Sequence, residues 1–184
     1  MVASCRIHKD GVLRVYRAID EFVLHIMSSD TFFIDANCGQ ILPIFANIAL
    51  ACDYRVTGDN AVFQNPTLEL GLVAKGGAGW HFSRLLSKGK AYELMLADND
   101  VTAADALKLG FIDRCVPAKE LEAEAMSVAR RFAGLPASSL KLAKRLLNHA
   151  ECNMADYLEF ENRELMKVIN EKQAYRKASG GPDE

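Results

Sequence analysis

The sequence predicts an α/β fold in which short strands alternate with helices. Three short segments rich in β-branched and aromatic residues, over residues 31–35, 54–56 and 61–64, are typical of strands. A helical pattern lies between the first two of these segments, and strands that are joined through a helix usually pair in parallel. With 184 residues, half of them hydrophobic, the chain is long enough to build one substantial core.

The first predicted helix precedes every strand. Apolar residues recur at helical spacing between Leu13 and Ile26, with charged residues between them, and the pattern ends near Ser28. The next helix follows Pro43, a residue favoured at the first helical position. Residues 44–52 are almost entirely apolar, which predicts a buried helix.

Local signals also mark the middle of the chain. The glycine-rich residues 71–79 lead into a predicted helix over residues 80–86. Thr102 and Asp105 have the spacing of a capping box, with aspartate in place of the usual glutamate. Gly110 then suits a left-handed helix cap.

A last predicted strand, over residues 111–116, comes before a helical remainder. The predicted helices of this remainder cover residues 118–133, 138–148 and 154–178. We therefore expect a partial α/β core over residues 1–133 and a C-terminal helical oligomerisation region over residues 134–184.

The composition argues against several partners. The net charge is -2, and basic residues are not clustered as a nucleic-acid surface requires. No apolar run reaches the length of a membrane span. The five cysteines form no CxxC pair and, with the four scattered histidines, offer no zinc spacing. We expect free thiols in a reducing compartment, hence a cytoplasmic protein without a metal, a nucleic-acid partner or a membrane partner.

Three segments, in order and at fixed spacing, follow one known family. The first runs from residues 36–39 (ANCG) to residues 49–55 (ALACDYR). The second comprises residues 63–66 (FQNP), 70–72 (LGL) and the paired glycines 76–77. The third comprises residues 91–94 (AYEL), 101–106 (VTAADA) and 109–112 (LGFI). Each is weak alone, but together they resemble the enoyl-CoA hydratase/isomerase (crotonase) family.

This resemblance implies a crotonase-like (ClpP/crotonase) spiral of ββα units that acts on acyl-CoA thioesters. In the family, two backbone N–H groups stabilise the thioester enolate, one of them at a helix N-terminus. The matching donor here is Ile44 N–H, with Phe45 and Gly39 lining the substrate site. Pro43, Ile44 and Phe45 replace glycines and imply a reshaped pocket; alternatively, Ile44 and Phe45 are core residues. No separate cofactor is implied, because coenzyme A is part of the substrate.

The resemblance also exposes a departure in the catalytic groups. Hydratases of the family use two glutamates for proton transfer, and the matching positions here hold Asn47 and Thr67. Neither side chain is a carboxylate base. Asn47 can orient a water or a carbonyl, and Thr67 can donate a hydrogen bond, although both have ordinary structural roles as alternatives.

Two further residues complete the candidate site. Glu69 lies two residues beyond Thr67, hence on the same face of an extended segment, and is the expected base. A surface glutamate is its alternative. Lys75 lies where some isomerases of the family carry an acid; pairing with Glu69, contact with a CoA phosphate and a solvated lysine are alternatives. His81 is more typical of packing than of catalysis.

Finally, the family's N-terminal third, which supplies the second oxyanion donor, has no counterpart, which implies a truncated, incomplete or divergent short member. The leading hypothesis is an enoyl-CoA hydratase/isomerase-type lyase or isomerase of fatty acid metabolism, working through a thioester enolate with non-standard catalytic residues. Isomerisation is favoured because it needs fewer proton-transfer groups. The alternative is a catalytically silent protein that binds acyl-CoA or acts as an oligomeric partner. The family's C-terminal helices imply a homotrimer or hexamer.

Overall fold

A computed structural model describes residues 9–65, 75–96 and 99–150, together with separate helical positions between residues 155 and 170. The described part contains two three-stranded sheets. In the first, β1 (Ile34–Asn37), β3 (Tyr54–Gly58) and β6 (Arg114–Val116) pair in parallel in that order. In the second, β4 (Val62–Phe63) pairs in parallel with β2 (Gln40–Ile41) and antiparallel with β5 (Val101–Thr102).

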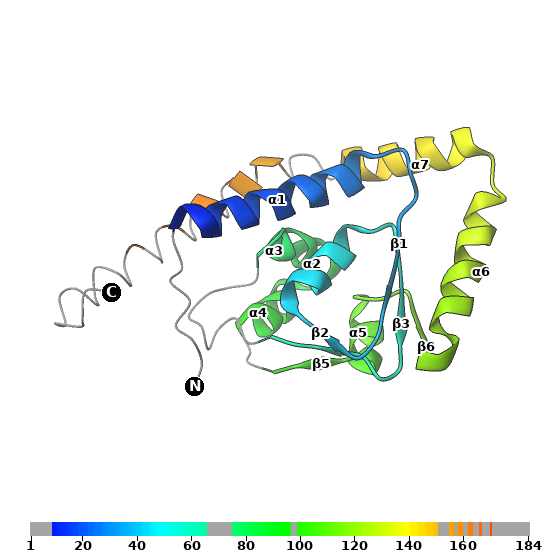
Figure 1. The fold of residues 1–184 in the computed structure, drawn as a ribbon, viewed down its shortest axis with the longest axis horizontal. Helices are drawn as coiled ribbons and strands as arrows, with labels where there is room; N and C mark the ends of the chain where they lie inside the picture. Colours follow the sequence, from blue (N-terminus) through cyan, green and yellow to red (C-terminus); the bar gives the residue numbers. More distant parts are fainter. Residues whose placement is uncertain are drawn as a thin grey trace.

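Helices surround these sheets. Their bounds are α1 (Lys9–Ser28), α2 (Pro43–Ala51), α3 (Ala78–Leu85), α4 (Lys88–Leu96), α5 (Ala103–Leu109), α6 (Leu121–Ala133) and α7 (Ala137–Ala150), with a 3₁₀ turn, η1 (Ala118–Glu120), before α6. Helices α1 and α7 run along one side of the molecule, and α6 stands at one end beside β1 and β3 (Figure 1). Helix α2 packs against α1 and α3, which places its N-terminus near the second sheet.

The locally predicted features are largely confirmed. Pro43 occupies the start of α2. The Thr102 Oγ1 atom accepts the N–H of Asp105 at 3.2 Å, and Gly110 ends α5 with φ +79°. The strand predicted over residues 111–116 is wrong in its first half. Phe111 N–H is bound to the Ala106 carbonyl at 2.8 Å as part of the helix cap, so it cannot pair in a sheet.

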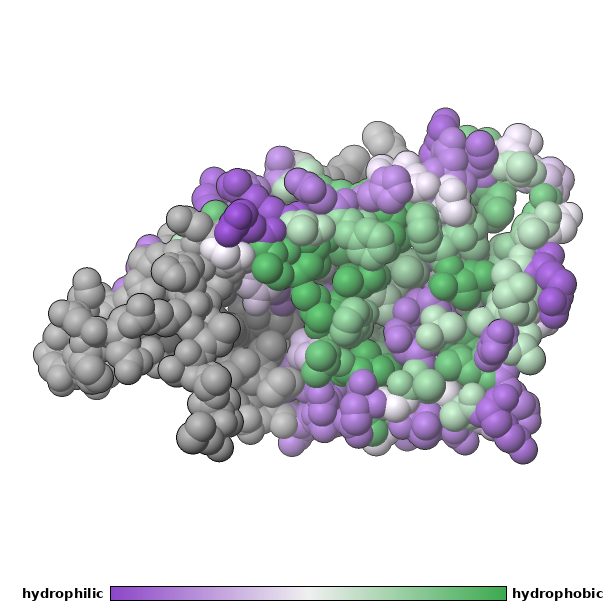
Figure 2. All heavy atoms as spheres, viewed as in Figure 1, coloured by the Kyte–Doolittle hydropathy of each residue, from purple (hydrophilic) through white to green (hydrophobic). Residues whose placement is uncertain are grey.

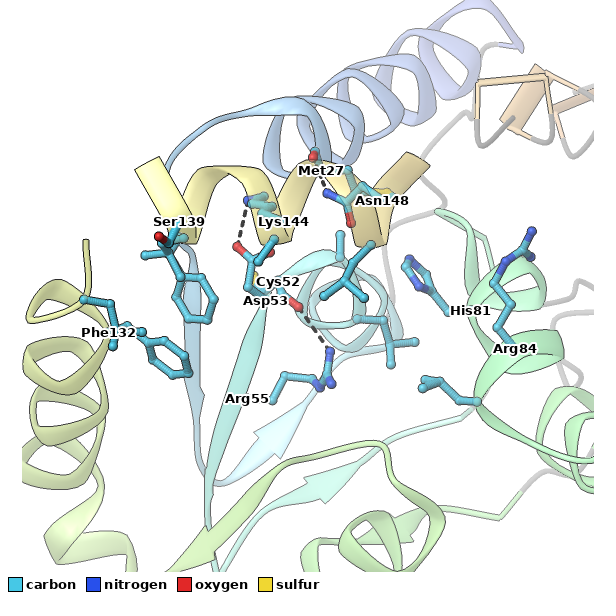
Figure 3. A pocket seen from close by; sticks show the side chains of 18 of the residues that line it. Met27, Cys52, Asp53, Arg55, His81, Arg84, Phe132, Ser139, Lys144 and Asn148 are labelled. Atoms are coloured by element: carbon cyan, nitrogen blue, oxygen red, sulfur yellow. Dashed lines mark hydrogen bonds and ion pairs between the residues drawn. The ribbon is translucent and has the colours of Figure 1, made fainter. Parts of the chain in front are cut away.

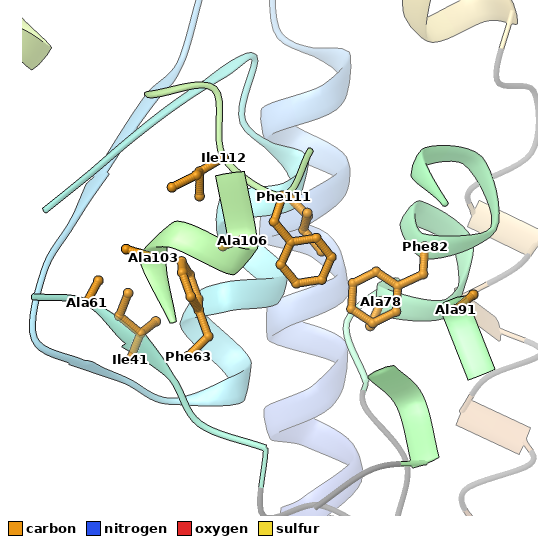
Figure 4. Packing of buried hydrophobic residues seen from close by; sticks show 11 residues of the cluster. Ile41, Ala61, Phe63, Ala78, Phe82, Ala91, Ala103, Ala106, Phe111 and Ile112 are labelled. Atoms are coloured by element: carbon orange, nitrogen blue, oxygen red, sulfur yellow. The ribbon is translucent and has the colours of Figure 1, made fainter. Parts of the chain in front are cut away.

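The main core joins α2, α3 and α5 to the second sheet. Phe82 and Phe111 stack with their ring centroids 4.9 Å apart, and Phe63 meets Phe111 edge-on at 6.5 Å (Figure 4). A second cluster packs Val23 of α1 against Trp80 of α3. Leu158, from the C-terminal helical positions, is 2% exposed in that cluster, so this part of the C-terminal region packs on its own chain.

Lys144 ties α7 to the remainder of the fold. Its Nζ atom donates to the carbonyls of Ile26 at 2.9 Å and Thr31 at 2.7 Å, and to the Asp53 carboxylate at 2.7 Å. The Lys144 side chain is 4% exposed. Since all three ammonium protons find acceptors, the buried charge is fully satisfied.

One face of the molecule is unusually apolar. The exposed side chains Val15 and Phe22 of α1, and Phe45 of α2 with Leu42 before it, are each about half exposed. Figure 2 shows apolar residues gathered over α2 and the adjoining flank of α1. Among the described helices, none combines the length and apolar composition needed to cross a bilayer.

We expect Gly58→Ala to destabilise the fold by about 1–3 kcal/mol. A Cβ atom on Gly58 would lie 2.9 Å from Cys38 Cβ and 3.3 Å from the Ala118 Cα atom, so the backbone must shift. Gly89→Ala is the matched control, because no atom lies within 4 Å of its added Cβ. Within α4 that change should raise stability by up to about 1 kcal/mol. Urea unfolding measures both, and equal midpoints for the two variants would contradict the packing at Gly58.

Candidate active site

The N-terminus of α2 presents an unpaired backbone donor. Gly39, with φ +69°, turns the chain from β1 into β2, and α2 then starts at Pro43. The Leu42 carbonyl accepts the N–H groups of Phe45 at 3.0 Å and Ala46 at 3.1 Å. Proline has no N–H, and the N–H of Ile44 has no acceptor among the described residues. The Ile44 N–H group therefore lies at the positive end of the helix, where an oxygen that gains negative charge is stabilised.

The side chains around this donor are apolar and accessible. Phe45 is 55% exposed, and Ile44 is half-buried. The alternative in which Phe45 is a core residue is therefore wrong. The buried positions of α2 fall later in the helix, at Asn47 and Ala49–Ala51, so the first turn faces outward.

The Asn47 side chain is held in one orientation. It is 5% exposed, and its Nδ2 atom donates to the Lys75 carbonyl. The loop that carries Lys75 continues through Gly76, where a Cβ would lie 3.5 Å from both Asn47 Cβ and Ile19 Cγ2. Gly76 has φ +71°, a conformation that favours glycine. Because Nδ2 is used by the loop, Oδ1 is the amide's remaining acceptor.

Lys75 belongs to a buried chain of polar groups. Its side chain is 7% exposed, and Nζ donates to Asn162 Oδ1 at 3.1 Å and lies 5.4 Å from the centre of the Tyr16 ring. Asn162 Nδ2 in turn donates to Asp20 Oδ2 at 2.5 Å. The alternative of a solvated lysine is therefore wrong. The structure brings Lys75 and Asn47 together through the lysine backbone, a contact that the sequence did not predict.

Asp20 is the charged residue that sequence reasoning missed. Burial raises the pKa of its carboxyl, while the hydrogen bond from Asn162 and the charge of Lys75 act in the opposite direction. Its Oδ1 atom is buried without a hydrogen-bond partner among the described residues. A signal was available, because Tyr16, Asp20 and Val23 lie on one face of the amphipathic helix.

Thr67 and Glu69 lie in residues 66–74, outside the described residues, so their roles stay predictions. The preceding Asn65 anchors the start of this segment. Its Nδ2 atom donates to the Leu94 carbonyl at 2.8 Å, and its N–H donates to Asp100 at 3.2 Å. At the other end, Lys75 is fixed by the contacts above.

Comparison with known proteins decides the family. The family model described as enoyl-CoA hydratase/isomerase matches residues 15–180. The chain belongs to the enoyl-CoA hydratase/isomerase family. It is 33% identical over 126 residues to a probable mitochondrial enoyl-CoA hydratase of Dictyostelium discoideum, covering 68% of this chain and 46% of that protein. It is 32% identical over 131 residues to probable enoyl-CoA hydratase echA8 of Mycobacterium tuberculosis, covering 71% and 51%.

Solved structures of the family share the fold. An enoyl-CoA hydratase from Mycobacterium avium subsp. paratuberculosis superposes with a TM-score of 0.80 at 26% identity, covering 85% of this chain and 66% of that one. A monofunctional enoyl-CoA isomerase from M. smegmatis has a TM-score of 0.67 at 28% identity, covering 74% and 65%. The predicted crotonase fold is thus confirmed. The chain spans about half the length of the curated relatives it matches.

Proposed function

We propose that the protein is an acyl-CoA enzyme of the enoyl-CoA hydratase/isomerase type. The observation that carries this proposal is the Ile44 N–H at the positive end of α2, which has no acceptor among the described residues, in a chain of this family. Ile44 N–H donates a hydrogen bond to the thioester oxygen, with Gly39 and Phe45 beside the substrate. Removal of an α-proton then places negative charge on that oxygen, where the donor and the helix dipole stabilise the enolate.

Proton transfer falls to Glu69 in this proposal. The Glu69 carboxylate removes the α-proton, Thr67 donates a hydrogen bond, and Asn47 orients the acyl group or a water through Oδ1. Lys75 acts indirectly, because its carbonyl holds the Asn47 amide. Named relatives include hydratases and an isomerase.

Double-bond isomerisation is the reaction we favour. The base takes a proton from the α-carbon of a β,γ-unsaturated thioester and returns it to the γ-carbon, which moves the double bond without adding water. A single carboxylate can perform both transfers, whereas hydration in this family uses two. Asn47 cannot ionise to supply the second.

We expect Glu69→Gln to lower kcat for enoyl-CoA isomerisation by at least about 100-fold, because the amide cannot accept the α-proton. The KM should change little. Glu93→Gln is the control, since Glu93 is an exposed residue of α4 paired with Lys90. Isomerisation and crotonyl-CoA hydration are both followed by the absorbance of the conjugated enoyl thioester.

The outcomes of this assay separate the two hypotheses. Turnover by the wild type that the Glu69 change abolishes supports catalysis. Acyl-CoA binding by calorimetry without any turnover supports the catalytically silent alternative. Absence of acyl-CoA binding contradicts both.

Assembly and location are further parts of the proposal. Leu142 and Leu146 of α7 are 58% and 62% exposed, which supports a homo-oligomeric contact, a trimer or hexamer, through the region from residue 134 onward. Light scattering after size-exclusion chromatography should give the mass of a trimer or hexamer, and a monomer at micromolar concentration would contradict this assembly.

Free thiols at Cys38, Cys52 and Cys115 support a cytoplasmic location, and the reaction class supports a place in fatty acid metabolism.

A further inference from the structure

A cavity of about 550 Å³ lies beneath α7, between that helix, the carboxyl end of α2 and α3 (Figure 3). It is distinct from the candidate active site. Its α2 residues are Leu50 and Ala51, whereas Ile44 lies at the other end of the same helix, about 10 Å away along the axis. The volume is in the range of small-molecule sites.

Most of the cavity wall is apolar. Met27 of α1, Leu50 of α2 and Leu140 of α7 contribute to it. The wall reaches solvent at Leu135 and Leu147, whose side chains are 48% and 70% exposed. An apolar chain that starts near His81 would therefore be covered inside the cavity and reach solvent at Leu135.

The wall also contains two polar side chains that are incompletely paired. Arg55 donates from Nη1 to the Cys52 carbonyl at 3.1 Å and pairs through Nη2 with Asp113 at 3.0 Å. Its Nε atom is buried and has no partner among the described residues. His81 is 7% exposed, and its buried Nε2 atom likewise lacks a partner within the described part of the chain. Each such donor costs about 1–3 kcal/mol until an acceptor reaches it.

The charges at the cavity favour an anion. Lys144 and Asp53 neutralise one another at 2.7 Å, and Asp113 neutralises Arg55 at 3.0 Å, which leaves Arg84 as the cation of the wall without a carboxylate partner among the described residues. Burial, with a smaller contribution from these two arginines, lowers the pKa of His81 to about 3. The imidazole is therefore neutral at physiological pH and can donate from Nε2.

We propose that this cavity binds a medium-chain fatty acid, with its carboxylate at Arg55 and His81 and its alkyl chain beneath α7 toward Leu135. The carboxylate supplies acceptors for the two nitrogens that lack a partner among the described residues, and it offsets the positive charge of Arg84. The alkyl chain covers the apolar wall. This site is independent of the acyl-CoA reaction, because it needs neither coenzyme A nor the residues around Ile44.

Trp80 provides a direct readout of binding. It is the chain's only tryptophan, its ring centroid lies 4.9 Å from that of His81, and Arg84 stacks on it at 3.7 Å. Titration of the full chain with octanoate should give a saturable change in tryptophan fluorescence. Octanol should bind at least about ten-fold more weakly, because it lacks the charge that strengthens hydrogen bonds to Arg55 and His81. Octylamine should not bind.

Variants test each end of the site. Arg55→Lys keeps the charge but removes Nε, and it should weaken octanoate binding by about ten-fold without weakening octanol binding. Leu135→Glu places a carboxylate beside the alkyl chain and should weaken both ligands. Leu107→Glu is the matched control, since Leu107 is 43% exposed on α5 and does not line the cavity in the described structure.

The proposal would be overturned by the absence of a saturable octanoate signal, by equal affinity for octanoate and octanol, or by the same effect from the changes at Leu135 and Leu107. Competition by butyryl-CoA would also contradict it, since that ligand belongs to the separate site at Ile44. If the protein binds octanoate but does not turn over enoyl-CoA, the proposed function fails and this proposal stands.

Discussion

Lys144→Met lowers the free energy of unfolding by about 3–5 kcal/mol, because it leaves the Asp53 carboxylate, which is 13% exposed, without its cation. The change also frees the carbonyls of Ile26 and Thr31, which lose the lysine as their hydrogen-bond donor. Asp53 keeps only a weaker interaction there, the N–H of Phe33 at 2.8 Å. Denaturant unfolding followed by circular dichroism measures the loss.

Lys141→Met is the control for this experiment. Lys141 lies one turn earlier on α7, is half exposed and approaches Asp30 at 3.5 Å. An exposed pair of this kind contributes less than about 1 kcal/mol. If the two variants unfold at the same denaturant concentration, the role of Lys144 as the anchor of α7 is contradicted.

Acidification destabilises the protein through His81. Burial lowers the pKa of this imidazole from 6.5 to about 3, so between these values the unfolded chain binds a proton that the folded chain does not. The contribution of neutral His81 to stability is fully present above pH 6.5 and is lost as the pH falls toward 3. The difference corresponds to about 5 kcal/mol at its greatest.

Asp35 acts in the opposite direction over part of this window. Burial raises the pKa of its carboxyl to about 6, so its contribution to stability falls as the pH rises from 3.8 to 6. The contribution of His81 is therefore the difference between the pH dependences of the unfolding free energy of the wild type and His81→Phe. Asp35 is present in both proteins, so its contribution cancels. The variant should show a much smaller loss of stability below pH 6.5.

His25→Gln is the matched control, because His25 is an exposed residue of α1. It should follow the wild-type curve of unfolding free energy against pH. A His81→Phe curve parallel to that of the wild type would show that His81 is not buried as a neutral imidazole.

The elements that were predictable are those with local causes. The periodicity of α1, Pro43 at the start of α2 and the Thr102 cap each involve residues within a few turns of one another. The antiparallel pairing of β4 with β5 joins strands nearly forty residues apart and carries no comparable local signal. Likewise, Phe111 has the composition of a strand residue, but the cap after α5 takes its N–H.

The candidate site divides in the same way. The family resemblance named Asn47 and Lys75 as separate site residues, and their contact through the Lys75 carbonyl was not predicted. Asp20 and Asn162 were not predicted, because their hydrogen bond spans 142 positions of the chain. No sequence pattern predicts this contact between the Asn162 amide and the Asp20 carboxylate, apart from the helical face that Asp20 shares with Val23.

These contacts bear on the role proposed for Asn47. The glycine loop holds its amide through the Lys75 carbonyl, and Lys75 is itself held through Asn162. The backbone donor at Ile44 does not depend on these side chains. Enolate stabilisation is therefore retained in the proposal, while the second proton-transfer group is lost.

Exchange of the α-protons of butyryl-CoA with solvent deuterium tests the enolate most directly. The reaction requires removal of an α-proton but neither water addition nor a double bond, so proton NMR in deuterium oxide isolates this step. We predict that the protein causes the α-methylene signal to disappear, and that Glu69→Gln slows the loss by at least about 100-fold. An unchanged α-methylene signal in the presence of saturating, calorimetrically verified butyryl-CoA would contradict the account.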